Sequence, residues 1–319
     1  MIKFEQTSKQ YRDGTLAVDR LDLDIREGEF LVLIGPSGCG KTTTLKMINR
    51  LIPYTSGRIL IDGKPVESYP LDHLRWNIGY VLQQIALFPH MTVEENITVV
   101  PEMKKWPKEK QKRRAAELLE MVGLDPAVYA RRKPSELSGG QQQRIGVIRA
   151  LAADPDILLM DEPFSALDPV SREELQNDLL QLKKTLGKTM VFVTHDMKEA
   201  LKLADRICLM RDGKIIQLGT PEELVGHPAD EFVRSFIGKA VSSPSHLIDL
   251  RPAAKVTSSG PPPRLSLPAD VPADRLLKAL AEEDRVGVEE DGETVGTIDR
   301  ASVFRLLADG LEKVERDHG

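Results

Sequence analysis

The stretch Gly35-Pro-Ser-Gly-Cys-Gly-Lys41-Thr42 decides the fold of this chain. It follows the apolar run Phe30–Ile34 and leads into Thr43-Thr44-Leu45-Lys46-Met47-Ile48, which reads as a helix. A strand, a glycine-rich loop, a Lys-Thr pair and a helix in this order cradle the phosphates of a nucleoside triphosphate. The glycines let backbone N–H groups turn inward, and the helix N-terminus adds partial positive charge. We expect Lys41 to reach the β- and γ-phosphates and the Thr42 hydroxyl to be a magnesium ligand.

The bulk composition is that of an ordinary globular protein of one or two domains, with 319 residues, 41% hydrophobic and 29% charged. A net charge of −5 gives no support to nucleic-acid binding. The two cysteines suit neither a disulfide framework nor a metal cluster, which favours a reducing cytosol. No signal peptide and no run near the roughly 18 apolar residues of a membrane span is present, so another chain would have to cross any bilayer.

Polar residues follow several predicted strands at the point where each strand ends. Three unbroken apolar runs are typical of parallel strands covered on both faces: Phe30–Ile34, Ile157–Met160 and Met190–Val193. The glycine-rich loop follows the first, Asp161 and Glu162 follow the second, and His195 comes shortly after the third. Gln83 likewise ends a strand predicted over Ile78–Leu82. Ligands collect beyond the carboxyl ends of such strands, so the shared position predicts a single site.

These strand-end residues suit phosphoryl transfer to water. Asp161 can hold magnesium, directly or through water, while the adjacent Glu162 points elsewhere and can polarise the attacking water. His195 is placed to contact the γ-phosphate and position that water. Gln83 can complete the metal and water shell. We therefore expect Glu162, His195 and Gln83 to be the catalytic set.

A second informative stretch is Leu137-Ser138-Gly-Gly140-Gln141, which opens a helix. It is either another anion site, built from helix-end N–H groups and a hydroxyl, or simply a loop with an N-cap serine. Before it, the region from Pro101 to about Glu136 has helical periodicity. Its Lys/Arg run, Lys104 to Arg114, favours a solvated helix face over a nucleic-acid patch.

The C-terminal part differs in composition from the rest. Residues 239–263 are rich in serine and proline and predict a linker. Residues 264–319 predict a small α/β unit with a helix at Leu276–Ala281, a hairpin about Asp291-Gly292 and a second helix at Phe304–Leu311. A unit of this size is marginal alone, so we expect it to pack on a partner.

Taken together, these motifs resemble the ordered set of ATP-binding cassette (ABC) ATPases. The match covers residues 1–238 and includes each motif of the family: the Walker A loop Gly35–Thr42, the Q-loop Gln83, the signature Leu137–Gln141, the Walker B strand Ile157–Glu162, the D-loop Ser165–Asp168 and the switch His195. The resemblance implies an α/β fold of the P-loop NTPase ABC type. This fold has a mixed sheet and a helical subdomain, here at about residues 90–150.

The resemblance also implies ATP and Mg²⁺ as cofactors and a homodimer in which each ATP lies between two chains. Ser138, Gly140 and Asp168 would act in trans, and Gln141 belongs to the same signature. Tyr11 falls where the family stacks adenine on an aromatic ring. The other residues implied in nucleotide binding are Val18, Ser37, Gly38, Cys39, Gly40, Lys41, Thr42 and Thr43.

Within the family, this chain is most similar to transport subunits. It lacks the long coiled coil of the DNA-repair types and carries one cassette, whereas ribosome-acting members usually carry two. Leu87–Ile97 and the C-terminal extension resemble bacterial importers. Leu45–Ile52 and Ile78–Ile85 are most similar to the uptake group for glycine betaine, carnitine and choline. The implied partners are two multi-span permease subunits and an extracytoplasmic substrate-binding protein or domain, with the chain on the cytoplasmic face of the membrane. The alternative is a non-transport ABC ATPase acting on nucleic acid or ribosomes.

Two further features stay open at the level of sequence. Within the unit 264–319, Arg264 to Ala308 is similar to one cystathionine-β-synthase-type (CBS) repeat, which normally occurs in pairs. The single copy can pair across the dimer, serve as a dimerisation contact, or have no regulatory role. Cys39, beside Lys41 and a helix N-terminus, either has a lowered thiol pKa or fills a position for a small residue, which we favour.

Overall fold

The computed structural model describes residues 1–241, 247–251, 254, 263, 265–272, 276, 279–280, 283–290, 293–299 and 302. The chain divides into two compact units, Met1–Val241 (unit 1) and Ser242–Gly319 (unit 2). In the described part of the chain, no helix combines the length and the apolar character needed to cross a membrane.

Unit 1 is built on a six-stranded sheet with the order β10-β9-β3-β8-β7-β6. Its strands are β3 (Phe30–Ile34), β6 (Ile78–Val81), β7 (Ile157–Asp161), β8 (Thr189–Val193), β9 (Arg206–Arg211) and β10 (Lys214–Gly219). The strands β6, β7, β8, β3 and β9 are parallel, and only β10 at the edge runs antiparallel to its neighbour. The expected parallel strands are confirmed, and their carboxyl ends share one edge of the sheet.

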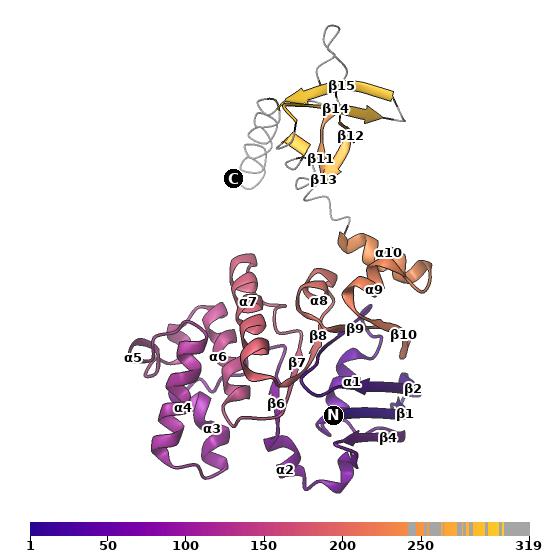
Figure 1. The fold of residues 1–319 in the computed structure, drawn as a ribbon. Coiled ribbons are helices and arrows are strands. Elements are labelled where there is room, and N and C mark those ends of the chain that lie inside the picture. Colours follow the sequence, from indigo (N-terminus) through magenta and orange to yellow (C-terminus); the bar gives the residue numbers. More distant parts are fainter. Residues whose placement is uncertain are drawn as a thin grey trace. The chain divides into compact units, whose positions relative to one another are not determined.

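A second sheet lies at the N-terminal end of the chain. It has the order β2-β1-β4-β5, and its registered pairs are antiparallel. The strands are β1 (Ile2–Gln10), β2 (Leu16–Ile25), β4 (Ser56–Ile61) and β5 (Lys64–Pro65), followed by η1 (Val66–Ser68) and α2 (Leu71–Trp76). In Figure 1 the β1, β2 and β4 arrows lie beside α1 (Lys41–Ile48).

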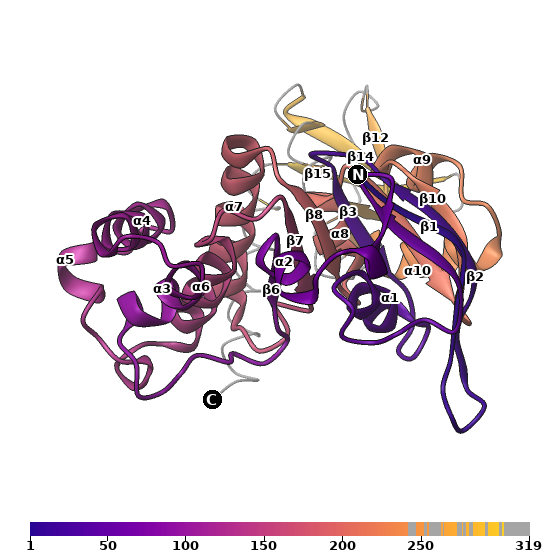
Figure 2. The same cartoon turned by 90° about the horizontal axis from the view of Figure 1, so that it is seen from below.

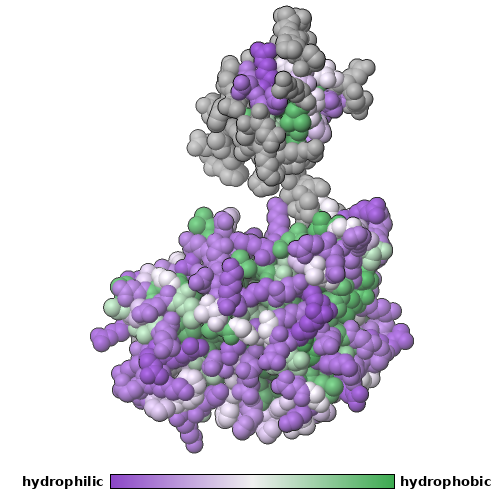
Figure 3. Space-filling view, in the orientation of Figure 1, coloured by the Kyte–Doolittle hydropathy of each residue, from purple (hydrophilic) through white to green (hydrophobic). Residues whose placement is uncertain are grey.

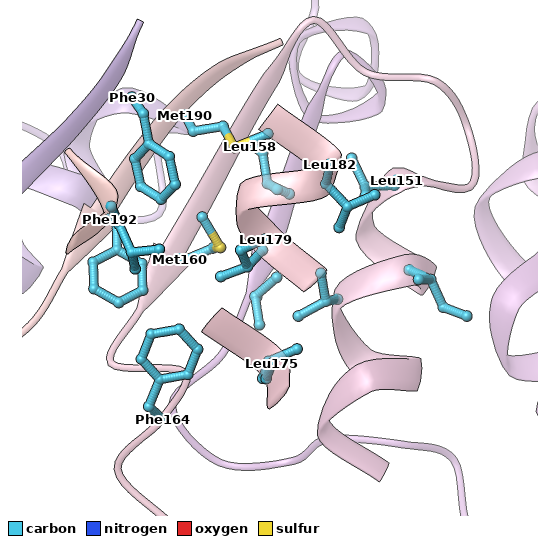
Figure 4. Packing of buried hydrophobic residues seen from close by; sticks show 14 of the residues in the cluster. Phe30, Leu151, Leu158, Met160, Phe164, Leu175, Leu179, Leu182, Met190 and Phe192 are labelled. Carbon is cyan, nitrogen blue, oxygen red and sulfur yellow. The ribbon is translucent and has the colours of Figure 1, made fainter. Parts of the chain in front are cut away.

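Alternate residues of the central strands enter two different cores, because successive side chains of a strand point to opposite faces. Phe30, Met160 and Phe192 belong to one cluster, which packs against helices that include α6 to α8. Figure 4 shows this cluster, with Phe164 and Phe192 side by side at a centroid distance of 5.2 Å. Leu159 belongs to the other cluster, which packs against α1 and the N-terminal sheet. Both faces of the sheet are therefore covered.

A group of helices lies to one side of the sheet, where the periodicity predicted a helical insertion. It contains α3 (Val93–Met103), α4 (Lys108–Met121), α5 (Pro126–Tyr129), η2 (Pro134–Glu136) and α6 (Gly139–Leu151). Figures 1 and 2 agree that α6 lies within this group and that α1 lies on the far side of β6 and β7 from it. The Thr92 hydroxyl accepts a hydrogen bond from Glu95 N in a capping box, which fixes the start of α3.

The remaining helices of unit 1 are α7 (Pro169–Leu186), α8 (Met197–Leu203), α9 (Pro221–Gly226) and α10 (Glu231–Val241). On the face that Figure 3 shows, hydrophilic residues predominate and hydrophobic ones form smaller patches between them. This distribution agrees with a chain in which 29% of residues are charged.

Unit 2 has its own small core and two short sheets. The strands are β11 (Leu247–Asp249), β12 (Ser266–Pro268), β13 (Asp270–Pro272), β14 (Arg285–Glu290) and β15 (Glu293–Asp299). The pairing of β14 with β15 is antiparallel, as the expected hairpin requires, and β12 runs parallel to β14. Strand β11 falls within the stretch expected to be a linker and pairs with β13. Leu276 and Leu280 are helical and buried, whereas the second expected helix, Phe304–Leu311, lies outside the described residues.

Candidate nucleotide-binding and hydrolysis site

The glycine-rich loop needs its glycines because other backbone comes close to it. A Cβ on Gly35 would lie 2.1 Å from the carbonyl oxygen of Met210, and one on Gly40 would lie 2.3 Å from that of Ala17. Gly40 is also the N-cap of α1, with φ at 103°, a conformation that favours glycine. Ser37 and Gly38 are exposed at the outer turn of the loop. Backbone N–H groups at the start of α1 are thus available to an anion.

Lys41 places its charge inside this loop. Its Nζ donates hydrogen bonds to the carbonyl oxygens of Gly35, at 2.8 Å, and Pro36, at 2.9 Å. The residue is 6% exposed. A buried ammonium needs such partners, since an unpaired charge is costly to bury. The side chain therefore lies along the concave side of the loop, where phosphate oxygens would be.

Thr42 and Asp161 meet directly although they are far apart in sequence. The Thr42 hydroxyl donates to Asp161 Oδ1 at 2.7 Å. The second carboxylate oxygen, Oδ2, accepts a hydrogen bond from the Tyr80 hydroxyl at 3.3 Å and lies 3.6 Å from the Lys46 ammonium. Mg²⁺ prefers hard oxygen ligands, and here a hydroxyl and a carboxylate oxygen lie next to each other. Thr42 and Asp161 therefore fit that ion.

The three expected catalytic residues converge on one carboxylate oxygen. Glu162 Oε2 lies 3.4 Å from Gln83 Nε2, which donates to it, and 3.3 Å from His195 Nδ1. Hydrogen bonds of this length are common at catalytic sites before substrate binds. Glu162 has φ at 45°, a left-handed conformation that is strained for a residue with a side chain. Its backbone N–H donates to Val193 O at 3.0 Å, which anchors the strained residue to β8.

Behind His195 lies a buried carboxyl that sequence reasoning did not identify. Glu199 on α8 is 5% exposed and accepts a hydrogen bond from the Thr194 hydroxyl at 2.5 Å. The same hydroxyl oxygen accepts from Asp196 N at 3.0 Å, so it holds the chain on both sides of His195. Burial raises the pKa of Glu199, while the bond from Thr194 opposes this shift. Through Thr194, Glu199 therefore holds in place the segment that carries the His195 imidazole.

The Ser-Gly-Gly stretch opens α6 with a capping box. The Ser138 hydroxyl accepts from Gln141 N, and the Gln141 side chain accepts from Ser138 N at 3.0 Å. A Cβ on Gly140 would lie 2.7 Å from Ser171 Oγ at the start of α7. The cap of α7 is Asp168, whose carboxylate accepts from two backbone N–H groups, and the Ser171 bonds hold its pKa below the usual range. Two helix N-termini are therefore adjacent here.

Comparison with known proteins identifies the family. The ABC transporter family profile matches residues 18–165. The chain is 52% identical over 320 residues to the glycine betaine/carnitine/choline transport ATP-binding protein OpuCA of Bacillus subtilis, covering 99% of this chain and 80% of that protein. This chain belongs to the ATP-binding subunits of ABC transporters.

Other relatives of the ABC subunit support the same assignment. The choline transport ATP-binding protein OpuBA of Bacillus subtilis is 50% identical over 283 residues, covering 89% of this chain and 73% of that protein. A solved dimeric structure of the ATP-binding cassette MJ0796 bound to ADP and Pi is similar, with a TM-score of 0.62 and 37% identity. The matched region covers 69% of this chain and 99% of the MJ0796 chain. The expected P-loop ABC fold is thereby confirmed.

Three residues of the ABC subunit beside the phosphate loop were expected to take part in nucleotide binding, and their surroundings differ. Tyr11 is 38% exposed and its hydroxyl lies 3.2 Å from Thr43 Oγ1, so its ring is accessible beside α1. Val18 is fully buried and packs beneath Gly40, so its side chain supports the loop from below rather than presenting a face to a base. Burial raises the pKa of the Cys39 thiol despite Lys41 Nζ at 3.8 Å. A lowered thiol pKa is therefore wrong, because desolvation outweighs the nearby charge.

Sequence reasoning also missed Tyr80 and Lys46, which both reach Asp161. The signal was present for Lys46, which lies four residues after Thr42 and hence on the same face of α1. For Tyr80 the position within a strand was known, but the register of β6 against β7 was not. That register is decided by tertiary pairing.

Proposed function

We propose that this ABC subunit hydrolyses ATP to drive the import of a quaternary-amine compatible solute of the glycine betaine, carnitine or choline type. The names of its relatives, at about half identity over most of both chains, support this substrate class. They favour transport over the alternative of a nucleic-acid or ribosome ATPase. The observation that carries the proposal is the convergence of Gln83 and His195 on Glu162, beside the Thr42–Asp161 pair.

In the proposed mechanism, Lys41 and the N–H groups of Ser37 to Thr43 bind the phosphates of ATP. Thr42 and Asp161 would hold Mg²⁺ and Gln83 would complete its shell; when bound, the ion would neutralise phosphate charge. Glu162 takes the proton of the attacking water, since its Oε2 is the common point of the site. His195 orients Glu162 and the γ-phosphate, and Tyr11 stacks on the adenine.

We propose that a second copy of the chain completes each site. Ser138, Gly140, Gln141 and Asp168 lie at the starts of α6 and α7, whereas Lys41 begins α1 on the other side of β6 and β7. The N-termini of α6 and α7 do not follow a glycine-rich phosphate loop in this chain. Their partial positive charge is suited to bind the γ-phosphate of an ATP that a partner copy holds. The similar cassette MJ0796 is dimeric in its solved structure with ADP and Pi, which supports this arrangement.

An apolar groove next to Gln83 is the proposed docking site for the permease. Its volume is about 500 Å³, and it is lined by residues from α2, β6, α3, α6 and the connecting segments, among them Leu51, Trp76, Tyr80, Leu82, Phe88 and Val100. Leu51, Leu82 and Phe88 are large hydrophobic side chains left 41–47% exposed. Because a transport ATPase subunit works with permease subunits that span the membrane, the proposed occupant is an apolar segment of such a subunit. The same proposal has the chain at the cytoplasmic face of the membrane as a peripheral subunit.

The remaining assignments concern the partners and the C-terminal part. An extracytoplasmic substrate-binding protein or domain would select the solute, since the cassette does not touch it. We assign 1–238 as the ATPase domain with its helical subdomain at about 90–150, 239–263 as a linker, and 264–319 as a single CBS-like regulatory or dimerisation unit. The β14–β15 hairpin with its buried Val286 and Ile298 supports that reading of unit 2.

Reconstitution tests the proposed function. The chain is assembled with its permease subunits and binding protein in liposomes that contain ATP, and uptake of labelled glycine betaine, carnitine and choline is measured. We expect ATP-dependent accumulation of at least one of them, abolished by Glu162→Gln. Failure to accumulate any of the three would contradict the substrate class, and ATPase activity stimulated by nucleic acid would favour the alternative.

A further inference from the structure

Tyr80 and Asp161 are neighbours because of how two strands pair. Strands β6 and β7 are parallel, and Tyr80 is in register with Leu159. Since side chains alternate along a strand, Tyr80, Leu159 and Asp161 share one face of the sheet. A diagonal neighbour two residues along is within reach of an aromatic side chain. The Tyr80 hydroxyl accordingly donates to Asp161 Oδ2 at 3.3 Å.

The two oxygens of Asp161 have different partners. Oδ1 accepts from the Thr42 hydroxyl, whereas Oδ2 faces Tyr80 and the Lys46 ammonium. The Asp161 side chain is 5% exposed, so solvent contributes little to its orientation. Lys46 is more exposed, at 32%, and acts through a flexible chain from 3.6 Å. Tyr80 is held by its ring among the residues of the second core and is the more rigid donor.

The same tyrosine belongs to the wall of the apolar groove defined above. Its neighbour Gly79 points to the opposite face of β6, where a Cβ would lie 2.4 Å from Ala150 O in α6. Strand β6 therefore contacts α6, which carries the signature, through Gly79, and it contacts the Asp161 carboxylate, proposed to hold magnesium, through Tyr80. A segment that enters the groove contacts Tyr80 without reaching Asp161 itself.

We propose that Tyr80 is a positioning residue: its hydroxyl fixes Asp161 Oδ2 for the metal, and its place in the wall of the groove makes this orientation respond to the segment that fills the groove. The second part rests on the proposed function, because it requires the permease to occupy the groove. The first part is a property of the isolated chain. The two parts are therefore tested separately.

The first experiment uses the full chain and compares Tyr80→Phe with Tyr69→Phe. Tyr69 is a matched control, because it is also half-buried and donates its hydroxyl to a single acceptor, Ile61 O, at 2.9 Å. Binding of a non-hydrolysable ATP analogue is measured by calorimetry in EDTA and in Mg²⁺. We expect Tyr80→Phe to bind like wild type in EDTA, but the increase in affinity that Mg²⁺ gives should be about five-fold smaller than in wild type, as the loss of one long hydrogen bond of 3.3 Å implies. Tyr69→Phe should keep the whole gain.

A purely structural role for Tyr80 would change the thermal midpoint or the EDTA affinity and leave the Mg²⁺ gain intact, and this result would overturn the positioning role. The second experiment measures ATPase activity of the same variants with and without the permease subunits. We expect the ratio of ATPase activity with the permease subunits to activity without them to fall for Tyr80→Phe and not for Tyr69→Phe. An unchanged ratio with a reduced Mg²⁺ gain would overturn the coupling to the groove. Failure of the wild-type chain to assemble with the permease would instead count against the proposed function.

Discussion

His195 Nδ1 lies 3.3 Å from Glu162 Oε2, although 33 positions separate the two residues in the chain. The contact follows from strand pairing, because Asp161 in β7 is in register with Val193 in β8. Glu162 follows Asp161 directly, and His195 comes two residues after Val193. The proposed base and the residue proposed to orient it are thus delivered by adjacent parallel strands. No loop closure is needed to bring them together.

Glu162→Gln should abolish turnover and keep nucleotide binding. The substitution preserves shape and the strained backbone but removes the proton acceptor, so the ATPase rate should fall by about 10²- to 10⁴-fold. Phosphate release and analogue binding are measured side by side. Glu120→Gln, an exposed position on α4, is the control and should behave like wild type. Normal turnover in the Glu162 variant would show that another group is the base.

Lys41→Ala should weaken ATP binding. It removes a buried ammonium that faces the inside of the loop, and charge-assisted bonds of this kind correspond to about ten- to hundred-fold in affinity. Titration calorimetry with the analogue gives the affinity, and Lys112→Ala on the exposed side of α4 is the comparison. Equal affinity of Lys41→Ala and wild type would contradict the phosphate role.

Glu199 should make stability depend on pH. Its pKa is raised above the ordinary 4.5 by burial, so the folded state binds a proton more tightly than the unfolded state. Its contribution is fully present below pH 4.5 and is lost as the pH rises through the raised value. Glu199→Gln cannot ionise and still offers an oxygen to Thr194, so its thermal midpoint should change less with pH above 4.5. A wild-type slope in this variant would refute the assignment.

Gly79→Ala and Gly146→Ala should have opposite effects on stability. A Cβ at Gly79 would lie 2.4 Å from Ala150 O, so overpacking should destabilise unit 1 by about 1–3 kcal/mol. Gly146 lies inside α6 with nothing within 4 Å of its Cβ position, so alanine should stabilise by up to about 1 kcal/mol. Thermal unfolding of both variants is the measurement. A neutral Gly79→Ala would mean that α6 can retreat from β6.

Truncation after Val241 should leave a folded, active ATPase. Among the residues that the structure describes, the last core residue of unit 1 is Ile237 and the first of unit 2 is Leu250, so the truncation spares every described core residue of unit 1. We expect basal ATPase activity to stay within about two-fold, since surface changes away from a core have small effects. Loss of the cooperative thermal transition would show that unit 2 is required for folding.

The local chain determined the phosphate loop, the apolar strands and the polar residues at their ends. A glycine turn and a buried strand are specified by a few consecutive residues, so the sequence alone predicts that Lys41 lies in the loop and that Asp161, Glu162 and His195 lie at strand ends. The sequence also predicted the helical insertion, because the helical spacing of its apolar residues can be recognised without knowing which elements they pack against.

The tertiary structure alone decided how these pieces act on one another. The hydrogen bond from Tyr80 to Asp161 depends on the register of β6 against β7, which pairs residues distant in sequence. The raised pKa values of Cys39 and Glu199 depend on desolvation, which only the packed core sets. Strand content and loop chemistry are local properties of the chain, whereas register and burial belong to the folded molecule.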